Sequence, residues 1–298
     1  MKQIVPNFWF DGQAEAAAAW YADVFGGRVV QTDYYTDEGK EIHGHNAGEV
    51  MTVTFEIGGQ RFVGLNGGPQ FSITPAISFF VTCADEQELD GLWAQLSDGG
   101  TVLMPVDAYP FSKRYGWVSD SFGVSWQLIL AEGPIQQKIT TSLLFSGDNY
   151  GKAAEALALY TAVFPDSEVG LISRYGEGQE PNDANAVAYG EATILGQKVS
   201  AMDSALEHAF TFTEGVSLMI ECDTQEEIDR YWQGLSANPE AEACGWLQDK
   251  YGVSWQITPR ILNDMLHEGT PEQVKAVTAS FMAMKKMDIA ALEQAYRS

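Results

Sequence analysis

The chain has 298 residues, of which 45% are apolar and 12% aromatic, and its formal charge at neutral pH is −24. This length and composition are typical of a globular protein with about two domains of roughly 150 residues each. The acidic balance repels phosphate backbones and anionic lipid surfaces, so we expect no nucleic-acid partner and no membrane partner.

The hydrophobic pattern of the first half predicts one order of elements twice. Strands are expected at 3–10, 28–35, 49–57 and 60–66, with an Ala-rich helix at 13–25 after the first of them. The order returns as a strand at 76–83, a helix at 86–97, and strands at 101–105, 114–119 and 124–130. Each series reads βαβββ, a unit whose sheet packs one face on helices and leaves the other free to line a cleft.

The second half of the chain repeats the first. Residues 71–97 align without a gap to residues 210–236, and the phrase SDSFGVSWQ, ending at Gln127, returns as QDKYGVSWQ, ending at Gln256. Such self-similarity indicates an internal duplication. Because Gly133 and Pro134 interrupt any regular element, we place the two halves at 1–133 and 136–262.

A helical tail is predicted at 263–298. Thr270 and Gln273 have the spacing of a capping box, with proline at the first helical position. An apolar stripe at helical spacing follows, consisting of Val274, Val277, Phe281 and Met284, and Asp288 can cap a last short helix. The stripe must be buried either on the chain's own second domain or on another subunit.

Cysteine spacing and the N-terminus bear on the compartment. Cys83, Cys222 and Cys244 lack CxxC spacing, so we expect buried free thiols rather than disulfides or a zinc site. The N-terminus has no signal-peptide pattern, and no stretch of about 18 apolar residues occurs. We therefore expect a cytoplasmic location.

Four segments carry a resemblance to a known family, namely 10–27, 58–81, 244–262 and 284–296. Together with the element order, these segments resemble the PhnB-like family, which is labelled 3-demethylubiquinone-9 3-methyltransferase. This family belongs to the vicinal oxygen chelate superfamily, which includes glyoxalases, bleomycin-resistance proteins and dioxygenases. The resemblance covers nearly the whole chain. It implies an α+β fold of two tandem glyoxalase-like domains, each of two βαβββ units, plus the helical tail. It also suggests an internal pseudo-dimer of the two domains, and a homodimer as a further option.

Metal-dependent relatives place His and Glu ligands on strands at four positions per site. Carried onto this chain, to within one residue at the middle positions, these are Pro6, Gly64, Ala76 and Gln127, and Thr141, Ala201, Gly215 and Gln256. Such side chains are poor ligands for a hard divalent ion, so we expect neither a metal nor another cofactor. The pair His43 and His45 is a weak metal candidate, because it has no evident partner and no counterpart in the second half.

Candidate ligand-binding residues come from the repeated phrase and from matched hairpins. Side chains alternate along a strand, so Gln127 and Ser125 share the face opposite Trp126. The candidates are Gln127, Gln256, Ser125, Ser254, Trp117, Trp246, Arg61 and Lys198. An alternative is that the phrase is architectural, a turn with a core tryptophan, and that Arg61 and Lys198 are solvated.

Three functions remain open at this stage. The first is a protein that binds a small organic molecule in sheet-lined clefts without metal. The second is an enzyme, either a metal-dependent lyase using His43 and His45 or a methyltransferase, although no Gly-rich nucleotide-binding turn is present. The third is an interaction protein with collapsed clefts that uses its acidic surface and its tail.

Overall fold

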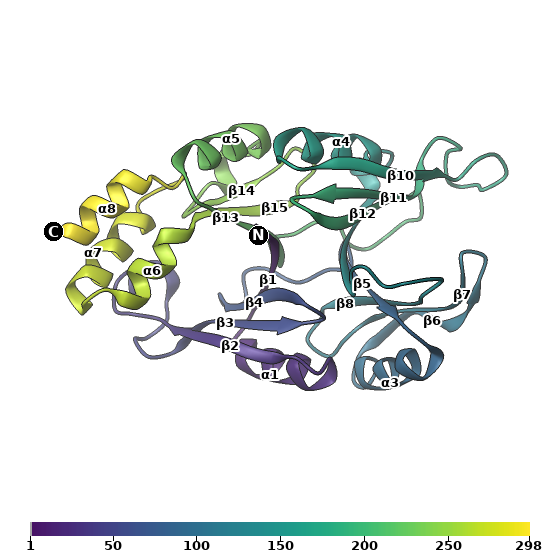
Figure 1. Ribbon diagram of the computed structural model, residues 1–298, viewed down its shortest axis with the longest axis horizontal. Coiled ribbons are helices and arrows are strands. Elements are labelled where there is room, and N and C mark those ends of the chain that lie inside the picture. The colour runs from purple at the N-terminus through teal and green to yellow at the C-terminus, as the bar shows by residue number, and fades with distance from the viewer. Residues whose placement is uncertain (1) are drawn as a thin grey trace.

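In a computed structural model, which describes residues 2–298, the chain forms one sheet of seven strands and one of eight, with four helices on their outer faces (Figure 1). The first unit contains β1 (Ile4–Phe10), α1 (Ala14–Val24), β2 (Arg28–Tyr34), α2 (Lys40–His43), β3 (Val50–Ile57) and β4 (Gln60–Asn66). The second contains β5 (Ile77–Cys83), α3 (Glu86–Leu96), β6 (Thr101–Tyr109), β7 (Ser112–Ser119) and β8 (Ser125–Leu130). The order expected for the first half is therefore confirmed, except that the short helix α2 lies where a loop was expected.

The second half follows with one strand fewer than expected. The third unit contains β9 (Ile139–Ser146), a 3-10 turn (Gly147–Asn149), α4 (Ala153–Val163), β10 (Glu168–Arg174), β11 (Val187–Ile194) and β12 (Gln197–Ser204). The fourth contains β13 (Val216–Cys222), α5 (Gln225–Leu235), a 3-10 turn (Pro239–Ala241), β14 (Trp246–Gln248) and β15 (Ser254–Pro259). Only two strands follow α5, because the segment between α5 and β14 forms the 3-10 turn instead of an edge strand.

Each sheet is shared between the two halves. Sheet A has the order β14-β15-β13-β1-β4-β3-β2, and sheet B has the order β10-β11-β12-β9-β5-β8-β7-β6. The joining pairs are antiparallel: β1 pairs with β13, and β5 pairs with β9. The first and fourth units thus make sheet A, the second and third make sheet B, and the halves interlock as an internal pseudo-dimer.

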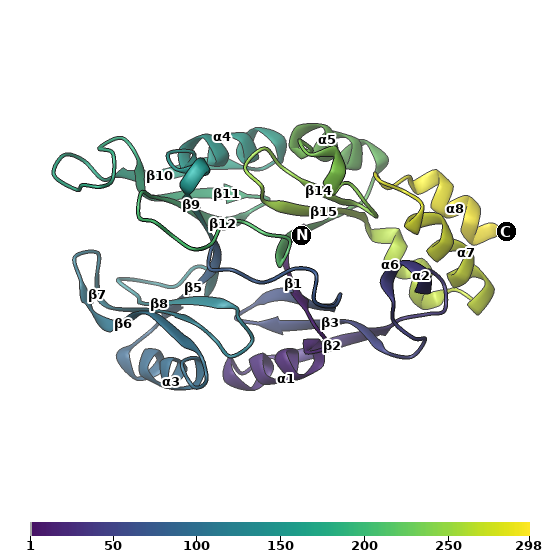
Figure 2. The same ribbon diagram turned by 180° about the vertical axis from the view of Figure 1, so that it is seen from behind.

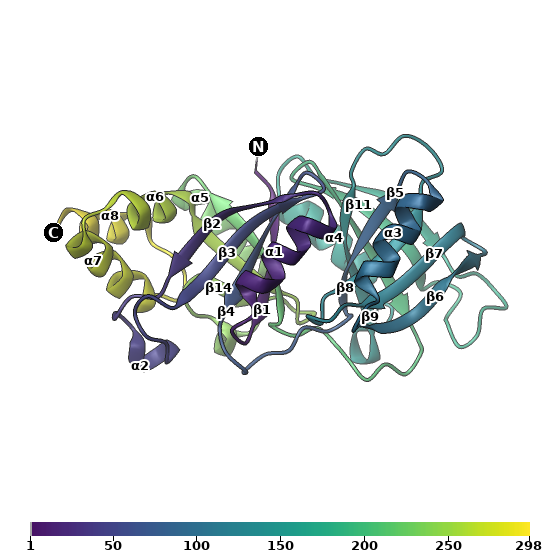
Figure 3. The same ribbon diagram turned by 90° about the horizontal axis from the view of Figure 1, so that it is seen from below.

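Both sheets bury their outer faces against helices. Helices α1 and α5 cover sheet A and helices α3 and α4 cover sheet B, so the inner faces are turned away from them (Figures 2 and 3). Large side chains of the outer faces are fully buried, among them Phe8, Phe79, Phe145 and Trp255. Free thiols occur at Cys83 and Cys222, which are buried, and at Cys244, which is half-buried.

The repeated phrase is architectural at its aspartate and its tryptophan. Asp120 accepts hydrogen bonds from the backbone N–H groups of Phe122 and Val124, from the indole of Trp126 at 2.8 Å, and from the hydroxyl of Tyr21 at 2.8 Å. Asp249 has the same four kinds of donor. Burial raises the pKa of both carboxyl groups above the usual value, while the donors act in the opposite direction.

The tail packs on its own chain. It consists of α6 (Arg260–Glu268), α7 (Pro271–Met282) and α8 (Ile289–Arg297), and it begins directly after β15 rather than after Leu262. The capping box of Thr270 and Gln273 is present, and Val277 is fully buried. The three helices lie next to sheet A, on the side away from sheet B (Figure 1). Within residues 2–298, no helix is both long enough and apolar enough to span a membrane.

Candidate ligand pocket

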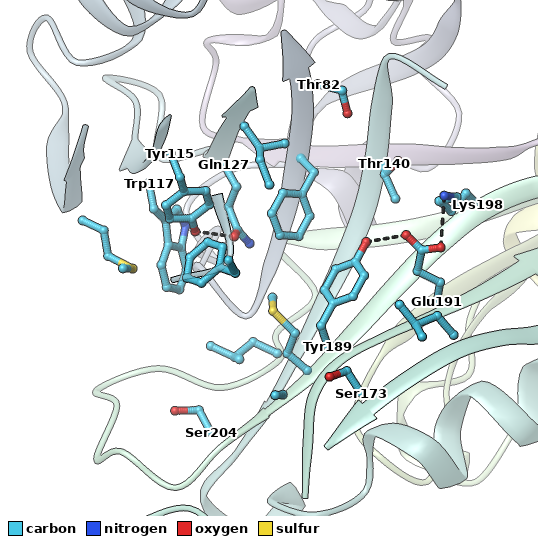
Figure 4. A pocket seen from close by; sticks show the side chains of 18 of the residues that line it. Thr82, Tyr115, Trp117, Gln127, Thr140, Ser173, Tyr189, Glu191, Lys198 and Ser204 are labelled. Carbon is cyan, nitrogen blue, oxygen red and sulfur yellow. Dashed lines mark hydrogen bonds and ion pairs between the residues drawn. The ribbon is translucent and has the colours of Figure 1, made fainter. Parts of the chain in front are cut away.

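A cavity of about 920 Å³ lies on the inner face of sheet B, between the second and third units (Figure 4). Aromatic rings supply much of its wall, from Phe80, Phe111, Tyr115, Trp117, Tyr175 and Tyr189. These rings come from both halves of the chain, since sheet B combines them. The cavity therefore exists only because the halves interlock.

Gln127 forms part of the cavity wall and is firmly oriented. Its side-chain oxygen accepts from the hydroxyl of Tyr115 at 2.5 Å, and its nitrogen donates to Ser78 Oγ at 2.7 Å. Trp117 also lines the cavity, and its indole donates to Ser125 Oγ at 2.7 Å. Ser125 itself is fully buried beneath the wall. The face of β8 that carries Ser125 and Gln127 therefore points toward the cavity, as the alternation along the strand predicted.

A polar group lies at one side of the cavity, on β11 and β12. Lys198 Nζ is 3.0 Å from Glu191 Oε2, and the hydroxyl of Tyr189 donates to Glu191 Oε1 at 2.7 Å (Figure 4). Burial and the neighbouring Glu191 raise the pKa of Tyr189, so its hydroxyl remains a hydrogen-bond donor at neutral pH. Sequence reasoning selected Lys198 and missed its two partners, although the alternation of Tyr189 and Glu191 along one strand was a visible signal.

The mouth of the cavity is apolar and exposed. Phe111, Leu171 and Leu206 line it while each keeps more than half of its surface accessible. Beside them, Ser204 Oγ lies 2.9 Å from His208 Nε2. Burial lowers the pKa of His208, so the ring is neutral at neutral pH. An apolar rim around an aromatic cavity favours a ligand with a large apolar part.

The chemistry of the donor set does not fit a divalent metal ion in this pocket. Among the described residues, the carboxylates that line it are Glu191 and Asp203, and Asp203 already accepts from the backbone N–H groups of Gly151, Ala153 and Val187. The remaining oxygens are those of hydroxyls and amides, which are weak ligands, and the imidazole Nε2 of His208 lies against Ser204 Oγ. Throughout the described residues 2–298, no three His, Cys, Asp or Glu side chains gather as a metal-binding group.

The positions carried over from metal-dependent relatives mostly face the helices. Ala76 and Ala201 belong to the hydrophobic core, and a side chain at Gly64 would contact Ala14 of α1 and Phe10. Pro6 and Thr141 lie two residues from core residues on each side, Ile4 and Phe8 in β1 and Ile139 and Leu143 in β9, so they point outward with them. Gln127 and Gln256, the other carried-over positions on strands, lie on the inner faces. Since an error of one residue reverses the face of a strand, the positions that face the helices do not correspond to a cleft-facing ligand.

The matching residues of sheet A are placed differently. Gln256 donates to Ser217 Oγ at 2.8 Å, in the same way as Gln127 to Ser78, and Trp246 packs edge-on against Trp9. Arg61 is not simply solvated, because it donates to Glu221 at 2.5 Å. Gln256, Trp246 and Arg61 do not line the cavity of sheet B.

His43 and His45 belong to a separate cluster at α2, which connects β2 and β3 of sheet A. The ring of Tyr35 stacks on His45 at 4.3 Å between centroids and contacts His43 at 4.5 Å. His45 Nδ1 lies 3.1 Å from Glu49, a partner that sequence reasoning missed, while His43 Nε2 faces the carbonyl of Glu38. His43 Nε2 and His45 Nδ1 therefore point to different partners rather than to one shared position.

Comparison with solved structures shows the class of fold. Glyoxalase I from Zea mays matches with a TM-score of 0.55 over 90% of this chain and 95% of that chain, at 10% identity. A PhnB protein from Bacillus cereus is 38% identical over 43% of this chain and 99% of its own, with a TM-score of 0.39. The match to glyoxalase I shows that the chain has a glyoxalase-like fold.

The family follows from a family model. The model described as 3-demethylubiquinone-9 3-methyltransferase matches residues 2–129 and again residues 137–258. The chain belongs to this PhnB-like family, and it carries the family's sequence in tandem. No curated protein matches the chain.

Proposed function

We propose that the pocket of sheet B binds a small organic molecule with an aromatic ring, without a metal ion or another cofactor. The observation that carries the proposal is the cavity of about 920 Å³ with six aromatic side chains in its wall. Pockets of about 300–1,000 Å³ suit ligands of drug-like size. The hypothesis that the clefts have collapsed is not favoured for sheet B.

The polar groups of the pocket would orient such a ligand. Lys198 has three donor hydrogens, of which the contact with Glu191 uses one. The remaining hydrogens and the free surface of Glu191 can bond to a polar substituent of the ligand. Gln127 serves mainly to fix the wall, because Tyr115 and Ser78 already engage both ends of its amide.

Binding is tested with 8-anilinonaphthalene-1-sulfonate (ANS), an aromatic probe whose fluorescence rises in apolar sites. We expect about one probe per chain, with affinity reduced roughly threefold or more by Phe111→Ala or Leu171→Ala, because each removes apolar contact area at the mouth. Val30→Ala, which truncates another exposed apolar side chain, on sheet A, is the control. Affinity that is unchanged by the mouth variants, or lost after dialysis against EDTA, contradicts the proposal.

The family description favours one alternative, methyl transfer. This reaction needs a methyl donor, and the sulfonium donor S-adenosylmethionine is the direct test. A rise in melting temperature at millimolar donor, removed by Leu171→Ala, would favour that alternative. No shift together with ANS binding would favour sequestration of a ligand.

A further inference from the structure

We propose that the inner face of sheet A is a second small-molecule site, which the chain's own helix α6 occupies. Release of α6 would then expose a site for the same class of molecule as the pocket of sheet B, an aromatic compound with a hydrogen-bonding group. The class of ligand rests on the proposed function, whereas the existence of the site does not.

The duplication lets the two inner faces be compared residue by residue. The ungapped alignment equates Thr82, in the pocket of sheet B, with Glu221 on sheet A. Strand pairing equates Ser173, which faces Tyr189 in the ladder, with Asp33, which faces Thr52. In the same register the bulge residue Leu171 corresponds to Gln31.

Helix α6 contacts the sheet A residues that correspond to the lining of the other pocket. Asn263 Nδ2 donates to Glu221 Oε1 at 3.2 Å, and His267 Nε2 lies 2.8 Å from Asp33 Oδ1. Gln31 also contacts the ring of His267, at 2.5 Å. The helix therefore lies where a ligand would lie in sheet B, and the other pocket has no such helix (Figure 1).

Two buried polar atoms remain on the inner face of sheet A. Asn7 Oδ1 and Ser254 Oγ have no hydrogen-bond partner within residues 2–298, and the side chains are 5% and 1% exposed. Both share the face of Gln256, because Asn7 and Ser254 pair with Ser217 in the ladders. A buried polar atom without a partner is unfavourable, so a ligand that donated a hydrogen bond to Asn7 Oδ1 would be stabilised there, whereas Ser254 lies deeper, as Ser125 does in sheet B.

Partly exposed polar pairs make up part of the contact between the tail and the sheet, beside the buried Leu262 and Met265 of α6. These pairs include His267 with Asp33 and Lys275 with Glu38, and exposed pairs are individually weak. A surface cavity of about 510 Å³ separates the start of α7 from the segment that follows Tyr35. Segments with such contacts open at lower free energy than core strands do.

The test combines hydrogen exchange with equilibrium dialysis of ANS on the full chain. In the variant Asn263→Ala/His267→Ala we expect amides of residues 260–268 to exchange at least tenfold faster while amides of β9 do not change. We expect this variant to bind one ANS molecule more than the parent chain, and Trp246→Ala to abolish the additional binding. Lys275→Ala, which breaks a tail contact away from the inner face, is the matched control and should add no ANS site.

A second measurement needs no variant. Saturating ANS should accelerate exchange of residues 260–268 in the parent chain, because the probe and α6 compete for one surface. The proposal is overturned if α6 is released in the variant without an additional ANS site, or if 260–268 exchange only by global unfolding in both proteins. If the parent chain binds no ANS and the variant binds one molecule, the proposed function of the sheet B pocket is refuted, whereas the site on sheet A is supported.

Discussion

The hydroxyl of Tyr21 donates to the carboxylate of Asp120 over 2.8 Å, and this bond joins a helix that covers sheet A to a turn of sheet B. Tyr160 and Asp249 repeat the arrangement at 2.7 Å, from a helix over sheet B to a turn of sheet A. The phrase that occurs once per half is therefore a connector between the sheets. Its aspartate is needed for packing rather than for chemistry.

Replacing this aspartate should destabilise the fold. In Asp120→Asn, an amide N–H₂ would face the indole N–H of Trp126, so one buried donor loses its acceptor. We expect a loss of about 1–3 kcal/mol in the free energy of unfolding, measured in urea. Asp90→Asn, which alters only an exposed pair with Arg114, should cost under about 1 kcal/mol. Equal effects of the two variants would show that the connector is unimportant.

Two helical glycines should respond to alanine in opposite directions. Gly91 lies exposed within α3, and a Cβ there would meet nothing within 4 Å. We expect Gly91→Ala to raise the free energy of unfolding by about 0.5–1 kcal/mol through helix propensity. At Gly234 of α5, a Cβ would lie 2.6 Å from Val163 Cγ2 of α4, so overpacking should outweigh that gain. Thermal and urea unfolding of both variants check the sign, and a stabilising Gly234→Ala would contradict this packing.

The docking of α6 should weaken as pH rises. The carbonyl of Asn263 and, more weakly, the carboxylates of Asp33 and Asp264 raise the pKa of His267. A raised folded pKa means that the stabilisation is complete below the unfolded value of about 6.5 and is lost as pH rises through the folded value. Because the pair is partly exposed, the effect should stay under about 1 kcal/mol.

Hydrogen exchange of 260–268, corrected for intrinsic rates, measures this effect between pH 5.5 and 8.5. We expect protection to fall with pH in the parent chain and to be nearly flat in His267→Gln. The same slope in both proteins would assign the pH dependence to another group.

The halves 1–133 and 136–262 should not fold as independent monomers. Cutting between them leaves β1 without β13 and β5 without β9, which exposes two long strand edges. We expect each half alone to self-associate or precipitate, and the two to co-purify when they are expressed together. A monomeric half 1–133 with cooperative unfolding, measured by size-exclusion chromatography and urea titration, would show that the boundary separates true domains.

Local pattern was enough to predict most elements and the direction of the repeated strand. Trp126 and Gln127 have the predicted opposite faces because alternation along a strand is a local property. The pairing of β1 with β13 was not readable, because the partners are about 210 residues apart and either half could have closed on itself. Consequently Tyr189 and Glu191 could not be grouped with Gln127 from the sequence.

The position of α6 was also beyond local reasoning. The apolar stripe that begins at Val274 in α7 required burial somewhere, but the pattern did not distinguish the chain's own second domain from another subunit, and it did not place α6 at all. His267 and Asp33, which are 234 residues apart, meet only when the tail turns back at Pro259. The missing edge strand of the fourth unit also depends on the tail. The backbone N–H groups of Cys244 and Gly245, just before β14, donate to the carbonyls of Met284 and Lys285 in the tail.

Fusing the two copies into one polypeptide frees them from symmetry. In an assembly of identical subunits, a substitution that fills one binding site also fills the equivalent site of the other subunit. A terminal extension that covers one site likewise covers the equivalent site. Here the helical tail follows β15 and occurs once, so only one of the twin surfaces receives it. The fused chain can therefore specialise one surface while retaining the other as it was.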